Sequence, residues 1–241
     1  MAAPEPTDKP KGIEFYGGYQ VYSESGVDLT LLRGNLRRSI EERWARNRRS
    51  AEFGLALWQS NPISKLPNCP IKRGPTVSDV ETVVKLLAAR NIQFVLIGGQ
   101  AMRAHGSMHS TEDTDICYQR TPDNLAALVA ALVPINPYLR GAPPGLPFRF
   151  DVPTLAAGLN FTLDTDLGEI DLLGEVSGIG GYDQVLAQSV ERTVLGLPVR
   201  ILSLDGLIAA KKAAGRKKDQ LQLSELIELK KMLDAAGETS E

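Results

Sequence analysis

Apolar residues recur at helical spacing in several segments after residue 76, and short apolar runs lie between these segments. The pattern predicts helices over residues 76–90, 100–105, 123–132, 203–214 and 219–235, with Thr76, Thr121 and Ser203 as caps. It predicts strands over residues 93–97, 115–118 and 199–202, and two more strands on either side of a turn at residues 166–168. Pro198 argues against an earlier start of the last strand, because proline cannot donate to a ladder. Strands mixed with helices, and a hairpin late in the order, predict an α/β (α+β) domain with a mixed sheet.

The segment before residue 60 differs from the rest of the chain in its local excess of positive charge. Ser39 and Glu42 form a capping-box pattern, and the apolar positions that follow share one helical face: Ile40, Trp44, Ala51, Leu55 and Trp58. Residues 33–49 hold seven arginines and two glutamates. Four prolines follow in residues 60–75, which indicates a linker. We therefore divide the chain into a tail (1–12), an N-terminal basic helical extension (13–59), a proline-rich linker (60–75) and an α/β domain with C-terminal helices (76–241).

Composition narrows the class of protein. The 241 residues are 43% hydrophobic with a net charge of −2, as expected for a globular protein with one sizeable core. No apolar run approaches the ~20 residues that span a bilayer, so we expect no membrane association. The first residues lack the apolar core of a secretory signal, and Cys69 and Cys117 form neither a disulfide framework nor a metal-ligand pattern. A cytoplasmic location is the expectation.

The chemistry is concentrated around two glycines and three aspartates. Asp113 and Asp115 open a predicted strand two residues apart, so their side chains point to the same face and repel each other unless a cation lies between them. Asp171 lies within the second predicted hairpin strand and adds a third carboxylate if the two strands are neighbours. Hard oxygen ligands favour Mg²⁺ or Mn²⁺. The pair Gly98–Gly99 ends a strand and opens a helix, where backbone N–H groups can cradle a phosphate.

These residues resemble a known signature. The run Gly98–Gly99, thirteen residues, Asp113-Thr114-Asp115-Ile116 and then Asp171 resembles that of nucleotidyltransferases of the DNA polymerase beta-like superfamily. The stretch from Gly98 to Gly106, which fits GG-x-A-x-x-x-HG, is most similar to the minimal bacterial nucleotidyltransferases, including the toxins of abortive-infection type toxin–antitoxin systems. A later lysine and a G-R-x-K-D run also recur, here as Lys211 and residues 215–219. The resemblance covers roughly residues 76–233 and implies a polymerase-beta-like fold, a mixed sheet flanked by helices.

The resemblance also implies roles. Asp113, Asp115 and Asp171 would be catalytic and would hold two Mg²⁺ (or Mn²⁺) ions. The expected nucleotide-binding residues are Gly98, Gly99, His109, Lys211, Lys212 and Arg216. The implied reaction moves a nucleoside monophosphate from an NTP to an acceptor, such as RNA (for example tRNA) or a protein, with a cognate antitoxin or accessory protein as a further partner. Two positions depart from the pattern: His109 stands where an arginine is common, and Thr114 where an apolar residue is usual.

Other interpretations compete with this one. The fold could serve a non-catalytic nucleotide- or partner-binding protein, or an enzyme that modifies a small molecule such as an antibiotic. His105 and His109 have the spacing of a helical zinc pair, although Gly106 interrupts the helix between them. Residues 178–183 fail the dinucleotide fingerprint at Asp183, and neither a P-loop nor a nucleophile elbow is present. The arginines of residues 33–49 fit either a solvated helix face or a docking helix for RNA or an acidic partner.

Overall fold

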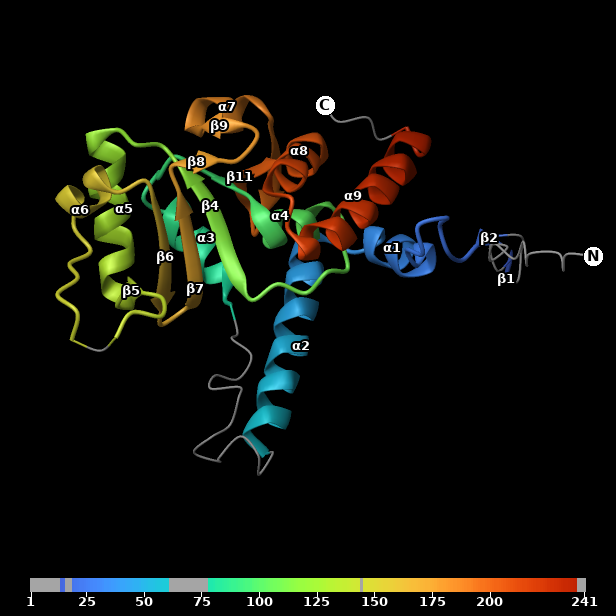
Figure 1. Ribbon diagram of the computed structural model, residues 1–241, viewed down its shortest axis with the longest axis horizontal. Coiled ribbons are helices and arrows are strands. Elements are labelled where there is room, and N and C mark those ends of the chain that lie inside the picture. Colours follow the sequence, from blue (N-terminus) through green and yellow to red (C-terminus); the bar gives the residue numbers. More distant parts are fainter. Residues whose placement is uncertain (1–13, 16–18, 61–77, 144, 238–241) are drawn as a thin grey trace, which may run out of the picture.

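The computed structural model describes residues 14–15, 19–60, 78–143 and 145–237 (Figure 1). Its helices are α1 (Leu29–Leu36), α2 (Ile40–Ser60), α3 (Val80–Ala88), α4 (Gly98–His105), α5 (Pro122–Leu132), the 3-10 helix η2 (Val133–Ile135), α6 (Val152–Ala157), α7 (Tyr182–Ala187), α8 (Leu204–Ala214) and α9 (Lys217–Ala235). Its strands are β1 (Glu14–Phe15), β2 (Tyr19–Gln20), β3 (Phe94–Leu96), β4 (Asp113–Tyr118), β5 (Tyr138–Leu139), β6 (Asn160–Thr165), β7 (Gly168–Leu173), β8 (Glu175–Val176), β9 (Gly180–Gly181), β10 (Ser189–Val194) and β11 (Leu197–Leu202). The α/β class with a mixed sheet flanked by helices is confirmed.

A seven-stranded sheet in the order β10-β11-β3-β4-β7-β6-β5 forms the centre of the molecule. Strand β4 runs antiparallel to β3 and parallel to β7. The β4–β7 register places Asp115 opposite Asp171, and Asp113 opposite Glu169. The expected neighbourhood of the two acidic strands is therefore confirmed, although 56 residues of sequence separate Asp115 from Asp171.

Strand β11 begins earlier than the sequence pattern indicates. It starts at Leu197 and includes Pro198, which lies opposite Thr193 of the edge strand β10. The register with β3 pairs Ile201 with Leu96, at the other end of β11. Pro198 therefore lies where the strand has a neighbour on one side, and a missing N–H is tolerated there. The exclusion of Pro198 was wrong for this reason.

Helix starts differ from the predictions by a few residues. Helix α3 begins at Val80, where the Asp79 carboxylate accepts a hydrogen bond from Thr82 N at 3.1 Å, whereas Thr76 lies outside the described residues. Helix α4 begins at Gly98, so the glycine pair forms its first turn, and it ends as expected at Gly106 with a φ of 116°. The Ser203 cap of α8 is confirmed by a 3.2 Å hydrogen bond from Gly206 N.

The N-terminal helices pack against the rest of the molecule. The capping box is confirmed: Ser39 N donates to Glu42 Oε2 at 2.9 Å, and Glu42 N donates to Ser39 Oγ at 3.2 Å. Trp44 of α2 is 1% exposed within the main core, and its Nε1 donates to Gln100 O at 3.1 Å. Contacts between α2 and α4 thus cross the division expected at residues 60–75, most of which lies outside the described residues.

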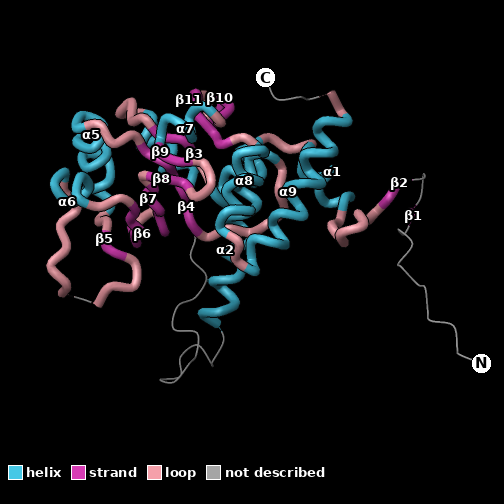
Figure 2. Tube along the Cα trace, turned by 45° about the horizontal axis from the view of Figure 1, so that its top comes forward, coloured by secondary structure: helices cyan, strands magenta, loops and turns pink. Residues whose placement is uncertain are grey.

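The second half of α2 leaves the body of the molecule (Figures 1 and 2). Phe53 and Leu57 are exposed there.

Cys117 is a free, buried cysteine of β4, and Cys69 lies outside the described residues. Within the described ranges, every helix is too short or too polar to cross a membrane.

Candidate active site

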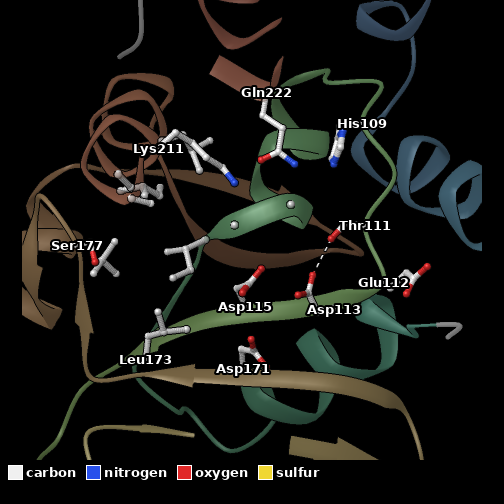
Figure 3. A pocket seen from close by; sticks show the side chains of 18 of the residues that line it. His109, Thr111, Glu112, Asp113, Asp115, Asp171, Leu173, Ser177, Lys211 and Gln222 are labelled. Atoms are coloured by element: carbon white, nitrogen blue, oxygen red, sulfur yellow. Dashed lines mark hydrogen bonds between the residues drawn. The ribbon is translucent and has the colours of Figure 1, made fainter. Parts of the chain in front are cut away.

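Three carboxylates converge at the centre of the sheet. Asp113 and Asp115 project from β4 and Asp171 from β7, and one oxygen of each lies within 4.8 Å of the others (Figure 3). Alternation along β4 puts the first two on one face, and the parallel register brings the third beside them. The convergence predicted from the sequence is therefore present in the structure.

The three carboxylates repel one another. Burial, together with the neighbouring charges of Asp113 and Asp171, raises the pKa of Asp115 to about 7. A hydrogen bond from the Gly99 backbone and the charge of Lys211 oppose this rise. A cation would relieve the repulsion among these carboxylates. Carboxylate oxygens are hard donors that suit Mg²⁺ or Mn²⁺, so these side chains fit a divalent ion.

The glycine pair lies directly against the carboxylates. Gly98 has a φ of 60°, and a Cβ at this position would lie 1.9 Å from Asp115 Oδ2. A Cβ on Gly99 would lie 2.2 Å from Thr111 Oγ1. Glycine fits both positions because the first turn of α4 packs against Asp115 of β4 and against Thr111, just before β4, too closely for a Cβ. The turn thus places the N-terminus of an eight-residue helix beside the acids, where an anion would be stabilised.

Two cationic side chains come from the C-terminal helices. Lys211 of α8 lines the pocket and points toward the carboxylates (Figure 3), and Arg216 lines it as the N-cap of α9. Asp219 holds both: its carboxylate accepts from Lys211 Nζ at 3.0 Å and from Arg216 Nε at 2.8 Å. Burial alone would raise the pKa of Asp219, but these hydrogen bonds outweigh it and lower that pKa to about 2. Lys212 is exposed and is not among the residues that line the pocket.

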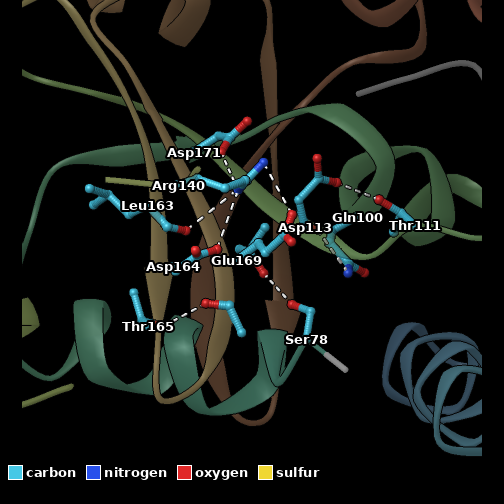
Figure 4. Close-up of polar contacts among 12 residues, drawn as sticks. Ser78, Gln100, Thr111, Asp113, Arg140, Leu163, Asp164, Thr165, Glu169 and Asp171 are labelled. Atoms are coloured by element: carbon cyan, nitrogen blue, oxygen red, sulfur yellow. Dashed lines mark hydrogen bonds and ion pairs between the residues drawn. The ribbon is translucent and has the colours of Figure 1, made fainter. Parts of the chain in front are cut away.

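Arg140 is a site residue that the sequence analysis missed. It follows the edge strand β5, and its guanidinium reaches Asp171 Oδ1 at 2.6 Å and Glu169 Oε2 at 3.1 Å (Figure 4). Asp164 Oδ1 lies 3.8 Å from Arg140 Nε. No local motif marks Arg140, because its partners lie on β6 and β7, more than 20 residues further along the chain.

The pocket around these groups has a volume of about 550 Å³, enough for a nucleotide. His109 lines it and is exposed. Gln222 of α9 also lines it, and its Oε1 accepts no hydrogen bond from any residue that the structure describes. No sequence motif marks Gln222, which lies between Leu221 and Leu223 in α9. Of the predicted site residues, all except Lys212 line this pocket.

Two further positions are explained by their surroundings. Burial lowers the pKa of His105 to about 4, and its Nε2 donates to Leu202 O at 2.8 Å, so it faces the core while His109 faces the pocket. This arrangement disfavours the zinc pair. Thr114 is fully buried, and its hydroxyl forms a 2.7 Å hydrogen bond with the Ser78 hydroxyl, which satisfies a polar group where the related pattern has an apolar one.

Comparison with known proteins shows only distant likeness. The chain matches no protein-family model and no curated protein. Among solved structures, it aligns with the lincosamide antibiotic adenylyltransferase LnuA bound to lincomycin at 10% identity and a TM-score of 0.43, over 62% of this chain and 95% of that one. It aligns with an antigenic nucleotidyltransferase-like protein from Paracoccidioides brasiliensis at 17% identity and a TM-score of 0.40, over 62% and 72% of the two chains. A third match is the antibiotic-resistance factor ANT(2'')-Ia, at 12% identity and a TM-score of 0.34, over 66% and 95%.

Proposed function

We propose that this protein is a metal-dependent nucleotidyltransferase, which moves a nucleoside monophosphate from an NTP to an acceptor nucleophile. The observation that carries the proposal is the convergence of Asp113, Asp115 and Asp171 to within 4.8 Å beside the Gly98–Gly99 turn. A protein that only binds nucleotide has no need of three acids that repel one another.

Each group has a distinct task in this proposal. The three aspartates would hold two Mg²⁺ or Mn²⁺ ions, which supply charge stabilisation at the reacting phosphoryl group. The backbone of Gly98 and Gly99 binds the triphosphate at the N-terminus of α4. Lys211 and Arg216 neutralise its charge, and Asp219 keeps both cations in place. His109, at the mouth of the pocket, adds a polar contact to the phosphates or the acceptor.

Asp171 acts as the general base on the acceptor. Its carboxylate accepts the proton of the attacking hydroxyl, the oxygen bonds to the α-phosphorus, and the bond to the leaving pyrophosphate breaks. Arg140 Nη2 donates to Asp171 Oδ1 at 2.6 Å, which orients the carboxylate for this task. Lys211 and Arg216 balance the charge of the pyrophosphate as it forms.

Labelled nucleotide and cell extract test the proposal. The purified protein is incubated with extract, Mg²⁺ and each of the four α-³²P-labelled NTPs in turn. We expect covalent label on an acceptor that ribonuclease, protease or solvent extraction then assigns to RNA, protein or small molecules. Asp113→Asn, Asp115→Asn and Asp171→Asn should each lower incorporation by orders of magnitude. Equal incorporation by the wild-type protein and all three soluble variants would reject the assignment.

We further propose that the protein acts as a toxin, which a cognate antitoxin holds in check. If transfer damages an RNA or protein of the host, induced expression of the wild-type chain should arrest growth, whereas the Asp115→Asn variant should not. Arrest by both proteins at equal expression would show that the toxicity does not come from transfer. Growth unaffected by the active wild-type enzyme would favour a small-molecule acceptor.

A further inference from the structure

Residues 106–112 connect α4 to β4, the strand that carries Asp113 and Asp115. It has no regular secondary structure beyond the turn at Gly106, and Asp113 follows it directly. The backbone groups of such a segment need partners from elsewhere in the fold. Several of these partners come from the N-terminal helices, more than 60 residues earlier in the chain.

Two asparagines bind this segment at its two ends. Asn35 of α1 is fully buried, and its Nδ2 donates to Gly106 O at 2.8 Å and to Ser107 O at 3.0 Å. Asn47 of α2 is 5% exposed and binds both backbone groups of Thr111: Nδ2 donates to Thr111 O at 2.7 Å, and Thr111 N donates to Oδ1 at 3.3 Å. Asn47 therefore fixes the peptide planes on both sides of Thr111, as a neighbouring strand would.

Thr111 connects this contact to the carboxylates. Its Oγ1 donates to Asp113 Oδ1 at 2.8 Å (Figure 4). The same hydroxyl lies against the glycine turn, where a Cβ on Gly99 would meet it at 2.2 Å. A donated hydrogen bond orients the Asp113 carboxylate, and a shift of the Thr111 backbone would move this donor.

We propose that Asn47 is a positioning residue for the metal site, which acts through Thr111 on Asp113, so that the N-terminal helical extension completes the active site. The inference rests on the proposed function to the extent that Asp113 is a metal ligand. The arginine-rich helix α2 is then neither a separate appendage nor only a solvated helix, because its inner face sets the orientation of a carboxylate 66 residues later in the chain.

Binding of Mn²⁺ to the full chain, followed by electron paramagnetic resonance, tests this proposal without relying on turnover. The variants are Asn47→Ala, Thr111→Val and Thr111→Ser, and Asn35→Ala is the matched control. Loss of a hydrogen bond to a metal ligand typically weakens affinity by about 10–100-fold. We expect a weakening of this size for Thr111→Val, about tenfold for Asn47→Ala, and near wild-type affinity for Thr111→Ser and Asn35→Ala.

A purely structural role predicts a different pattern. Both asparagines are buried and bind the same segment, so a structural role predicts that both alanine variants lower the melting temperature and affect Mn²⁺ binding equally. The positioning role predicts that both lower the melting temperature but that only Asn47→Ala weakens Mn²⁺ binding. In the double variant Asn47→Ala/Thr111→Val the effects on affinity should not add, because Asn47 acts through Thr111. Equal Mn²⁺ affinity of the two asparagine variants, or full additivity in the double variant, would overturn the proposal.

Three further outcomes are informative. If Asn47→Ala does not fold, Asn47→Asp retains the acceptor for Thr111 N and loses the donor to Thr111 O, and wild-type Mn²⁺ affinity in this variant would overturn the proposal. If the wild-type protein binds Mn²⁺ with the expected dependence on Asn47 but transfers no nucleotide, the proposed function fails while the positioning role stands. If it binds no Mn²⁺, both fail.

Discussion

Replacing Asp115 by asparagine should stabilise the protein when no divalent ion is added. The folded-state pKa of Asp115 is about 7, against an ordinary value of 3.8, because burial and two neighbouring carboxylates disfavour its charge. At 1.36 kcal/mol per pKa unit, this difference corresponds to an upper bound of about 4 kcal/mol of destabilisation above pH 7. Relaxation and the weakened bond to Gly99 N reduce the expected gain for Asp115→Asn to about 1–3 kcal/mol.

The sign of the pH dependence follows from the raised pKa. Between pH 3.8 and about 7 the folded protein binds more protons at Asp115 than the unfolded chain does, so stability falls as pH rises through this window. The advantage of Asp115→Asn should therefore be largest at pH 8 and vanish near pH 4. Urea unfolding of both proteins in EDTA at these two pH values measures it.

Addition of Mg²⁺ should reverse the order of stability. Wild-type protein at a concentration of ion 100 times its dissociation constant gains about 2.7 kcal/mol, and the variant, which lacks a ligand, gains much less. Asp234→Asn, an exposed position in the last turn of α9, controls for the loss of a negative charge. The reasoning is refuted if Asp115→Asn is less stable than wild-type at pH 8 in EDTA and gains as much from Mg²⁺.

Three other substitutions probe the rest of the site. Gly98→Ala should cost more than about 2 kcal/mol of stability and abolish transfer, because its Cβ would overlap Asp115 Oδ2 at 1.9 Å. Thermal unfolding and a transfer assay measure the two effects, and a stable, active variant would contradict the close approach. Asp219→Asn should destabilise by about 1–2 kcal/mol at pH 7. This loss should shrink as pH falls from 3.8 through about 2, since the lowered pKa stabilises the fold only while Asp219 is charged. Urea midpoints at pH 7 and about pH 2.5 should therefore show a smaller loss at the lower pH, and a loss independent of pH argues against the charge. Lys211→Ala should weaken NTP binding and reduce its salt dependence, whereas Lys212→Ala should leave NTP binding unchanged, because Lys212 is exposed and does not line the pocket. Calorimetric titration at two salt concentrations compares the two variants, and equal effects would remove Lys211 from the triphosphate site.

Much of the site could be predicted because its signals are local. Asp113 and Asp115 alternate on one strand, and the glycine pair marks the strand-to-helix turn, so short-range rules place them. The prediction for Asp171 depended on β4 and β7 being neighbours, which the register confirms. The Ser39–Glu42 capping box and the Ser203 cap are likewise local patterns, and both are present.

The remainder depends on contacts that no short pattern encodes. Arg140 follows the edge strand β5 and reaches Asp171 of β7, two strands further into the sheet, and Asn47 contacts Thr111, 64 residues later in the chain. Both residue types are ordinary on a solvated surface, and only the folded arrangement gives them partners. Helix α1 has only eight residues, too few for a periodic pattern to identify it, and a cap by Asp28 together with the burial of Leu29 and Leu32 defines it instead.

Transfer of label from two differently labelled forms of one NTP tests the central claim most directly. Wild-type protein, Mg²⁺ and extract are incubated with NTP labelled either at the α- or at the γ-phosphate. The arrangement of Asp113, Asp115 and Asp171 beside the glycine turn predicts that α-label becomes covalently bound to the acceptor, while γ-label leaves as pyrophosphate. Label from the γ-phosphate on the acceptor, or no bound α-label with any of the four NTPs, would contradict it.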